Sequence, residues 1–147
     1  MRKGSGEAKP ADDDPAAVVR DFIAAMHAWE LSAAAAMDEA KRAGENGFLE
    51  KYGIQAGQDA VFAQFCTPKA RPYGRRGSFS RPPEYQPDQE TILGVAIESS
   101  RRAVVETQRN TGFQSRRRYV LLRQGGRWRL DSVKWRQVDG DWRNGAL

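Results

Sequence analysis

The sequence has very little of the chemistry that metal centres and covalent catalysis need. It contains one cysteine, Cys66, and one histidine, His27, among 147 residues. A single cysteine excludes a disulfide framework and a cysteine-based zinc site, and a single histidine excludes a His-rich metal centre. We therefore expect no metal, no cofactor and no catalytic residue. We expect His27 to be a surface or packing residue and Cys66 to be a small buried hydrophobic side chain.

Long hydrophobic runs are also missing. Charged residues make up 29% of the chain, and no apolar run approaches the roughly 20 residues that cross a bilayer. The first 14 residues are polar and acidic, without the apolar stretch of a secretory signal. We expect a soluble, cytoplasmic protein with no membrane partner. Residues 1–14 are expected to be a flexible lead-in, and residues 15–147 to form one domain, since 39% apolar residues suffice for one core.

Positive charge is concentrated near the C-terminus. Residues 1–100 carry 12 Lys/Arg and 15 Asp/Glu, a net charge of −3, whereas residues 101–147 carry 12 and 4, a net charge of +8. Such a basic third can attract nucleic acid, an anionic membrane surface or an acidic protein. It can also be the solvated, Arg-rich outer face of a sheet, which is the interpretation that this scattered pattern favours.

Apolar residues recur every three or four positions in the first part of the chain, which indicates helices. Asp14 and Pro15 are a typical helix start, because aspartate can cap free N–H groups and proline fits the first helical position. We expect one long helix over Pro15–Ala43, a weaker helical stretch near Phe48–Tyr52 and a third helix near Gln58–Cys66.

From Thr91 onward, the period of the apolar residues changes to two, which indicates strands. Gly125-Gly126 predicts a hairpin, because a two-residue turn needs positive φ at both positions. A turn at Asp139-Gly140 would let Trp142 return as a short edge. The expected strands are Thr91–Glu98, Ala103–Arg109, Arg116–Arg123 and Arg127–Arg136. Helices followed by an antiparallel meander predict an α+β domain whose helices cover one face of a curved sheet.

The segment from Tyr119 to Trp135 combines a hydrophobic strand, a glycine turn and a strand of the pattern Trp-x-aliphatic-Asp-Ser-aliphatic. This segment resembles the closing hairpin of the cone-shaped nuclear-transport-factor-2-like (NTF2-like) domains, which share the order of three helices and then strands. The resemblance implies an NTF2-like cone, in which N-terminal helices pack on a curved antiparallel sheet.

Segments in the middle of the chain carry a second resemblance. They are Ala28–Glu30, Phe65–Lys69, Arg71–Arg75, Ser78–Tyr85 and Glu98–Ala103 with Thr107. Together they resemble the NTF2-fold immunity proteins of bacterial polymorphic toxin systems. The resemblance implies a non-catalytic inhibitor whose partner is the C-terminal domain of a cognate toxin. It does not identify that toxin.

The interior of such a cone leaves an enzymatic alternative open. NTF2-like enzymes place an acid and a tyrosine inside the cone, and Asp131 and Tyr119 are the pair that corresponds here. Alternation along the strand puts Asp131 with Arg129 and Val133, which favours a structural ion pair with arginine over catalysis. An isomerase-like enzyme or small-molecule-binding protein would need an open polar pocket that includes Asp131 or Glu106. The cavity candidates are Trp29, Tyr119, Asp131 and Trp135.

Residues 70–89 contain four prolines and predict a long loop, and long loops in compact domains are often functional. Arginine and tyrosine are the side chains that most often dominate binding energy at protein interfaces. The partner-binding candidates are Arg71, Tyr73, Arg75, Arg76, Phe79, Arg81 and Tyr85. Alternatively, the loop wraps the open edge of the sheet and buries Tyr73, Phe79 and Tyr85.

Three functions from different classes remain open. An immunity protein is favoured by the resemblance and by the scarcity of catalytic side chains, and an NTF2-like enzyme or small-molecule-binding protein comes second. A nucleic-acid-binding module that uses the Arg-rich sheet is supported least. Because the C-terminal third carries a net charge of +8, we expect a protein partner with an acidic contact surface, and association that slows as salt rises.

Overall fold

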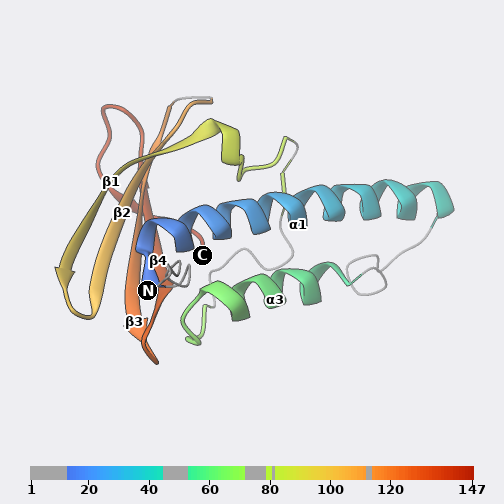
Figure 1. Cartoon of the computed structure of the whole chain (residues 1–147). Coiled ribbons are helices and arrows are strands. Elements are labelled where there is room, and N and C mark those ends of the chain that lie inside the picture. Colours follow the sequence, from blue (N-terminus) through green and yellow to red (C-terminus); the bar gives the residue numbers. More distant parts are fainter. Residues whose placement is uncertain (1–12, 45–52, 72–78, 81, 112–113) are drawn as a thin grey trace, which may run out of the picture.

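The structure, a computed structural model, describes residues 13–44, 53–71, 79–80, 82–111 and 114–147. Its helices are α1 (Pro15–Ala43), α3 (Ile54–Phe65) and the short 3-10 helix η2 (Pro87–Gln89). Its strands are β1 (Glu90–Ser99), β2 (Arg102–Arg109), β3 (Arg116–Gln124), β4 (Arg127–Arg136) and β5 (Arg143–Asn144). The strands form one antiparallel sheet in the order β1-β2-β3-β4-β5 (Figure 1). The predicted α+β class is confirmed.

The long helix α1 has the bounds that the sequence predicts. Oδ1 of Asp14 accepts a hydrogen bond of 3.0 Å from the backbone N–H of Ala16, which caps the first turn. Gly44 ends the helix in the left-handed conformation with a φ of 67°, where glycine carries no steric cost. The buried stripe of the helix includes Val18, Phe22 and Met26.

Helix α3 begins four residues earlier than the sequence predicts. It starts at Ile54, after Gly53, and Gly57 lies within it. A Cβ atom at Gly57 would come within 3.1 Å of the Trp29 ring, so the glycine allows α3 to approach α1 closely. Because glycine is a poor helix former, helix propensities alone do not predict this first turn of α3. The helical stretch expected near Phe48–Tyr52 lies outside the described residues.

All four predicted long strands are confirmed, with ends that differ by one residue at most. Gly125 and Gly126 have φ values of 58° and 77°, as the hairpin between β3 and β4 requires. The chain also returns after the Asp139-Gly140 turn, but the short edge strand is β5, one residue beyond the expected Trp142.

Three irregularities in the strand register bend the sheet. Two of them interrupt the pairing of β1 with β2, between Ile92 and Gly94 and between Ile97 and Ser99. The third lies on β4, where Ser132 and Leu130 pair with consecutive residues of β3 and leave Asp131 without a partner. Such a bulge changes the face to which the following side chains point. The expectation that Asp131 shares a face with Val133 is therefore wrong.

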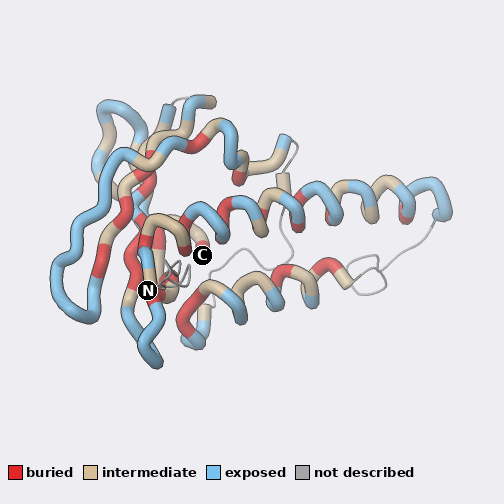
Figure 2. The backbone as a smooth tube through the Cα atoms, viewed as in Figure 1, coloured by how far each residue is buried: buried red, intermediate tan, exposed pale blue. Residues whose placement is uncertain are grey.

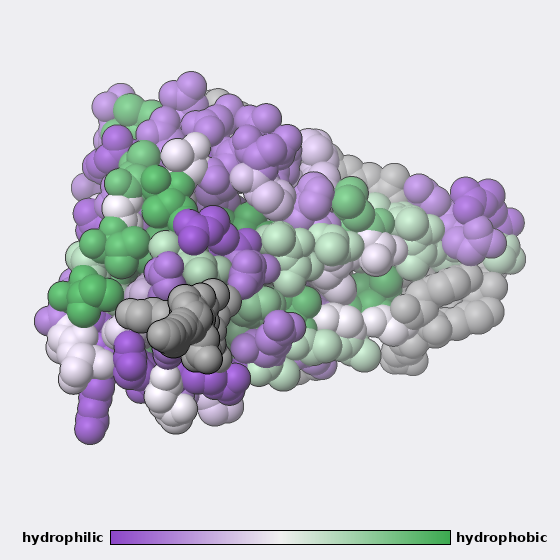
Figure 3. Space-filling model, viewed as in Figure 1, coloured by the Kyte–Doolittle hydropathy of each residue, from purple (hydrophilic) through white to green (hydrophobic). Residues whose placement is uncertain are grey.

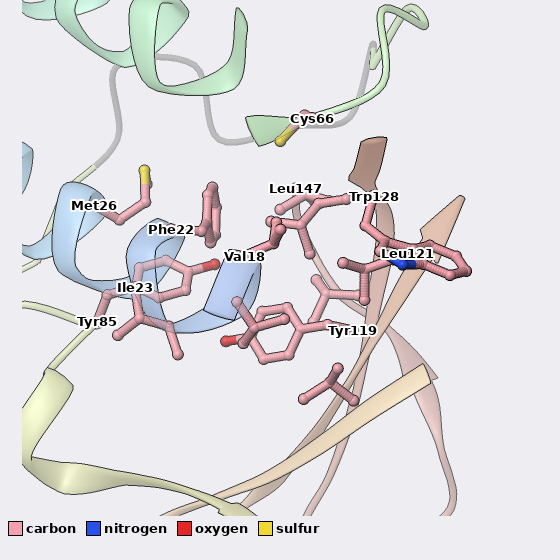
Figure 4. Packing of buried hydrophobic residues seen from close by; sticks show 14 of the residues in the cluster. Val18, Phe22, Ile23, Met26, Cys66, Tyr85, Tyr119, Leu121, Trp128 and Leu147 are labelled. Atoms are coloured by element: carbon pink, nitrogen blue, oxygen red, sulfur yellow. The ribbon is translucent and has the colours of Figure 1, made fainter. Parts of the chain in front are cut away.

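The hydrophobic core lies between α1 and one face of the sheet (Figures 2 and 4). Phe22 is in contact with Tyr85, with ring centroids 5.5 Å apart and the rings nearly perpendicular. Tyr119, Leu121 and Leu130 supply the fully buried sheet side of this core. The C-terminal half of α1 extends past the sheet, and α3 packs along α1 (Figure 1).

A buried carboxylate attaches the segment before β1 to α1. Glu30 is fully buried, and its carboxylate accepts hydrogen bonds from the backbone N–H of Ser80 at 3.2 Å and of Tyr85 at 3.0 Å. Backbone N–H groups that are buried need an acceptor. Glu30 therefore fixes where this segment crosses the helix.

Replacing Glu30 with alanine should cost about 2–4 kcal/mol of unfolding free energy, because it removes a buried charged acceptor from two backbone groups. The matched control is Glu39→Ala on the same helix, where the carboxylate is 56% exposed and pairs with Arg42. The control should change stability by less than about 0.5 kcal/mol. Urea unfolding followed by circular dichroism measures both values, and equal losses would contradict the anchoring role.

Candidate functional site

Polar side chains gather on the face of the sheet that α1 covers. We call Glu84, Glu90, Thr107, Arg117 and Tyr119 the buried polar cluster. Glu90 accepts hydrogen bonds from Thr107 at 2.6 Å, from Tyr119 at 2.8 Å and from Arg117 at 3.2 Å. Arg117 also pairs with Glu84 at 3.1 Å. Because each charge has partners, the cluster satisfies the groups that burial takes away from water.

Burial and charge set the protonation states in this cluster. Burial raises the pKa of Tyr119 well above its ordinary value, by more than the positive charge of Arg117 lowers it. Burial acts to lower the pKa of Arg117, but Tyr119, Tyr85, Glu90 and Glu84 together raise it well above its ordinary value. The tyrosine therefore stays protonated as a hydrogen-bond donor, and the guanidinium stays charged.

A pocket of about 390 Å³ opens beside the buried polar cluster. Its lining includes Glu84, Arg109, Arg117, Trp135 and Gln137. Among the lining residues that the structure describes, neither Asp131 nor Glu106 occurs. The enzymatic alternative needs one of these two acids in an open polar pocket, and this pocket holds neither. Glu106 instead lines a separate surface hollow of about 620 Å³ over the sheet, where it is paired with Arg116 and Arg118.

Asp131 and Tyr119, the acid–tyrosine pair of the enzymatic alternative, do not bind each other. Tyr119 is bonded within the buried polar cluster, whereas Asp131 accepts hydrogen bonds from Thr67 at 2.9 Å and from Lys69 at 3.0 Å. The expectation of a structural ion pair at Asp131 agrees with this geometry, but its expected partner is wrong. Arg129 instead donates to the backbone carbonyl of Cys66 at 2.9 Å.

Asp131 belongs to the junction where the segment after α3 joins the sheet. The backbone N–H of Thr67 donates to the carbonyl of Leu130 at 2.8 Å, and a parallel bridge joins Cys66 to Leu130. Partial burial acts to raise the pKa of Asp131, but the hydrogen bonds from Lys69 and Thr67 outweigh it and lower the pKa below its ordinary value. The bulge at Asp131 is what points its carboxylate towards this segment.

The four cavity candidates do not line one cavity. Trp29 is buried between the helices, where its Nε1 donates to the carbonyl of Ile54 at 2.8 Å. Tyr119 is fully buried, Asp131 lies at the junction with residues 66–71, and Trp135 lines the pocket beside the buried polar cluster. The four candidates therefore lie in different parts of the fold, and ligand binding by any of them stays a prediction.

The described members of the predicted partner-binding loop point inward. Arg71 donates to the backbone carbonyls of Thr67 and Lys69 and, across the junction, to that of Leu130. Phe79 meets the Trp29 ring edge-on at 6.3 Å, and Tyr85 is only 2% exposed.

These three side chains have contacts within the fold; Tyr85 is buried, whereas Arg71 and Phe79 are only half-buried, and their role in partner binding stays a prediction. Tyr73, Arg75, Arg76 and Arg81 lie outside the described residues, and their role in partner binding stays a prediction.

The outer face of the sheet carries arginines that have partners. Glu106 pairs with Arg116 at 3.3 Å and with Arg118 at 3.0 Å. The guanidinium groups of Arg118 and Arg136 lie over the Trp142 ring, 4.1 Å and 5.2 Å from its centroid. Much of the positive charge in the C-terminal third is therefore held in ion pairs and cation–π contacts.

His27 and Cys66 both have structural partners. Nδ1 of His27 donates to the backbone carbonyl of Tyr85 at 2.8 Å, so the histidine packs between helix and loop. Cys66 is 1% exposed and lies in the core. Within the part of the chain that the structure describes, no group of three or more His, Cys, Asp or Glu residues could hold a metal ion. No helix among these residues has the length and apolar character to cross a membrane.

Helices over one face of a curved antiparallel meander form an NTF2-like arrangement, and comparison with known proteins agrees. The NTF2-fold immunity protein family matches residues 14–146. Immunity protein RhsIA of Dickeya dadantii (strain 3937) is 31% identical over 116 residues, which cover 78% of this chain and 81% of that protein. No solved structure matches the chain significantly. The chain belongs to the NTF2-fold immunity protein family, as its motifs indicate.

The low pKa of Asp131 makes a pH-dependent contribution to stability. Because the folded state lowers this pKa below the unfolded value of 3.8, the contribution is present above about pH 4 and is lost as the pH falls further. The difference in Tm between the wild type and Asp131→Asn should be larger at pH 6 than at pH 3. Lys69→Gln removes the same ion pair, so the difference in Tm between the wild type and this variant should likewise be larger at pH 6 than at pH 3. Thermal unfolding at both pH values measures this, and a constant difference would contradict it.

The Cys66 thiol should be unreactive in the folded protein. Burial raises its pKa to about 12, and the reactive species is the thiolate. We expect no labelling by iodoacetamide at pH 8 in the native state and full labelling in guanidinium chloride, measured by mass spectrometry. Ser100→Cys, in the exposed turn between β1 and β2, should add one label in the native state. Rapid native labelling of Cys66 would contradict its burial.

Proposed function

We propose that this chain binds the C-terminal domain of a cognate bacterial toxin in the cytoplasm and neutralises it by binding alone. Membership of the NTF2-fold immunity protein family carries the proposal. The likeness to immunity protein RhsIA over most of both chains supports it further.

The geometry of the covered face supports a role without chemistry. A general acid or base must reach a substrate proton, but Tyr119 and Glu90 are bonded to each other and are almost completely buried. Asp131 is held by Lys69 and Thr67 away from the pocket. These groups are committed to the fold, which supports inhibition through a binding surface.

The stoichiometry of neutralisation tests the proposal. The toxin domain is identified by mass spectrometry after it co-purifies with the tagged chain from its native host, and its activity is then titrated with the purified chain. An inhibitor that acts by binding should abolish activity only at about one equivalent, since each complex holds one toxin. Neutralisation by a small fraction of an equivalent, or failure to capture any toxin domain, would contradict the proposal.

Two substitutions extend this test to the titratable residues that an enzyme would use. His27→Asn and Asp131→Asn should protect toxin-expressing cells as well as the wild type, provided that circular dichroism shows each variant folded. Loss of protection with toxin affinity unchanged would indicate chemistry at that residue and would contradict inhibition by binding alone.

A further inference from the structure

Two turns at one end of the sheet bring four arginines together. Arg101 lies in the turn between β1 and β2 and Arg102 begins β2, whereas Arg123 and Arg127 flank the turn between β3 and β4. The backbone N–H of Arg123 donates to the carbonyl of Arg101 at 2.9 Å, so the two turns lie side by side (Figure 1). We call these four residues the arginine end of the sheet.

Positive charge exceeds negative charge at the arginine end. Residues 98–102 and 123–127 contain four arginines and one carboxylate, Glu98. Glu98 pairs with Arg102 at 2.6 Å, and both side chains of this pair are about half exposed, at 46% and 49%. Arg123 lies over the Trp128 ring at 4.7 Å, which holds its guanidinium in place. All four arginines are exposed, and they lie at the end of the sheet opposite the β4–β5 turn.

Strand β1 supplies an apolar surface that ends at these arginines. It is the first strand of the sheet, and among the residues that the structure describes it pairs only with β2, so none of the described strands lies along its outer side. Val95 is 44% exposed and Ile97 is 59% exposed, although they lie opposite the fully buried Val105 and Ala103 of β2. The apolar face of the sheet therefore continues beyond the part that the core covers (Figure 3).

The edge of β1 is suited to strand pairing between Gly94 and Ile97. The register with β2 is continuous over these four residues, between the two irregularities of the strand. This segment contains neither proline nor a charged residue, the features with which proteins usually block an exposed edge. An extended segment from another protein can add to such an edge through main-chain hydrogen bonds, while its side chains meet the exposed apolar ones.

We propose that the outer edge of β1 and the arginine end together form the surface that binds the toxin. This proposal rests on the function proposed above. The occupant is an extended segment of the toxin domain that places apolar side chains on Val95 and Ile97 and carboxylates beside Arg101 and Arg123. Charge complementarity identifies this occupant, because Glu98 already pairs with Arg102, whereas Arg101 and Arg123 are exposed at this end of the sheet, where the carboxylates of a partner can reach them. A second copy carries the same net charge of +5 and brings no excess of carboxylates, whereas an acidic partner does.

Substitutions at the two ends of the sheet test this assignment. Ile97→Lys places a charge on the apolar edge, and the double variant Arg101→Glu/Arg123→Glu reverses the charge of the arginine end. The matched controls are Val138→Lys, at a valine that is 61% exposed, and Arg143→Glu on β5, at the opposite end of the sheet. Because all of these positions are exposed, the Tm of each variant should stay close to that of the wild type.

The affinity of the full chain for the captured toxin domain is then measured by calorimetry, together with the association rate at several salt concentrations. Ile97→Lys and the double arginine variant should each raise Kd about tenfold or more, whereas the controls should stay within about twofold. The association rate of the wild type should fall as salt rises, and the double arginine variant should lose much of this dependence.

Each other outcome overturns a defined part of the inference. If the wild type binds the toxin and the variants bind as tightly, the surface assignment is wrong while the proposed function stands. If Ile97→Lys leaves toxin affinity unchanged but converts a dimer into a monomer in sedimentation, the edge of β1 binds a second copy of the chain instead of the toxin. If the double arginine variant loses affinity only for a DNA duplex used as a probe, the arginine end binds nucleic acid. If the wild type binds no toxin, the proposed function fails and this surface fails with it.

Discussion

The rest of the structure depends on the buried guanidinium of Arg117. A buried charge costs several kcal/mol unless it is paired and hydrogen-bonded, so the folded state must bring partners to the middle of β3. These partners come from separate parts of the chain, because Glu90 begins β1 and Glu84 precedes it. The centroid of the Tyr85 ring lies 4.5 Å from the same guanidinium, and the ring also contacts Phe22 of α1. One charge thus couples the sheet, the segment before it and the long helix.

This constraint determines where function can lie. The covered face uses its polar groups to satisfy Arg117, and Glu90 alone accepts three hydrogen bonds there. Groups committed in this way are poor at proton transfer but give a rigid scaffold. A rigid sheet can present an edge strand at a low ordering cost, which favours tight binding. The exposed residues Val95 and Ile97 lie where the sheet extends beyond the core, so the surface that we propose for the partner is an extension of the same sheet.

Local signals allowed the sequence to predict most of the fold. A capping aspartate, a terminal glycine and a change of apolar period mark α1 and the four long strands without reference to the rest of the chain. The candidate site depends on contacts between distant residues and could not be predicted in this way. The Lys69–Asp131 ion pair joins residues 62 positions apart, and it needs a bulge that alternation does not reveal. Tyr85 is buried where its backbone N–H donates a hydrogen bond to Glu30. The residue type alone could not predict this burial, because tyrosine is also common at protein interfaces.

Composition overstates the charge that can act on a partner. The net charge of +8 in residues 101–147 already counts Glu106, but it does not count Glu84 and Glu90, which lie earlier in the chain and pair with Arg117 within the fold. Fields from exposed charges decay over about 8 Å at physiological ionic strength, so only local excess steers a partner towards a particular surface. Residues 98–102 and 123–127 provide such an excess, because Glu98 pairs with Arg102 while Arg101 and Arg123 are exposed there. The salt dependence of the proposed toxin binding should therefore reflect the exposed Arg101 and Arg123 rather than the charge of the whole C-terminal third.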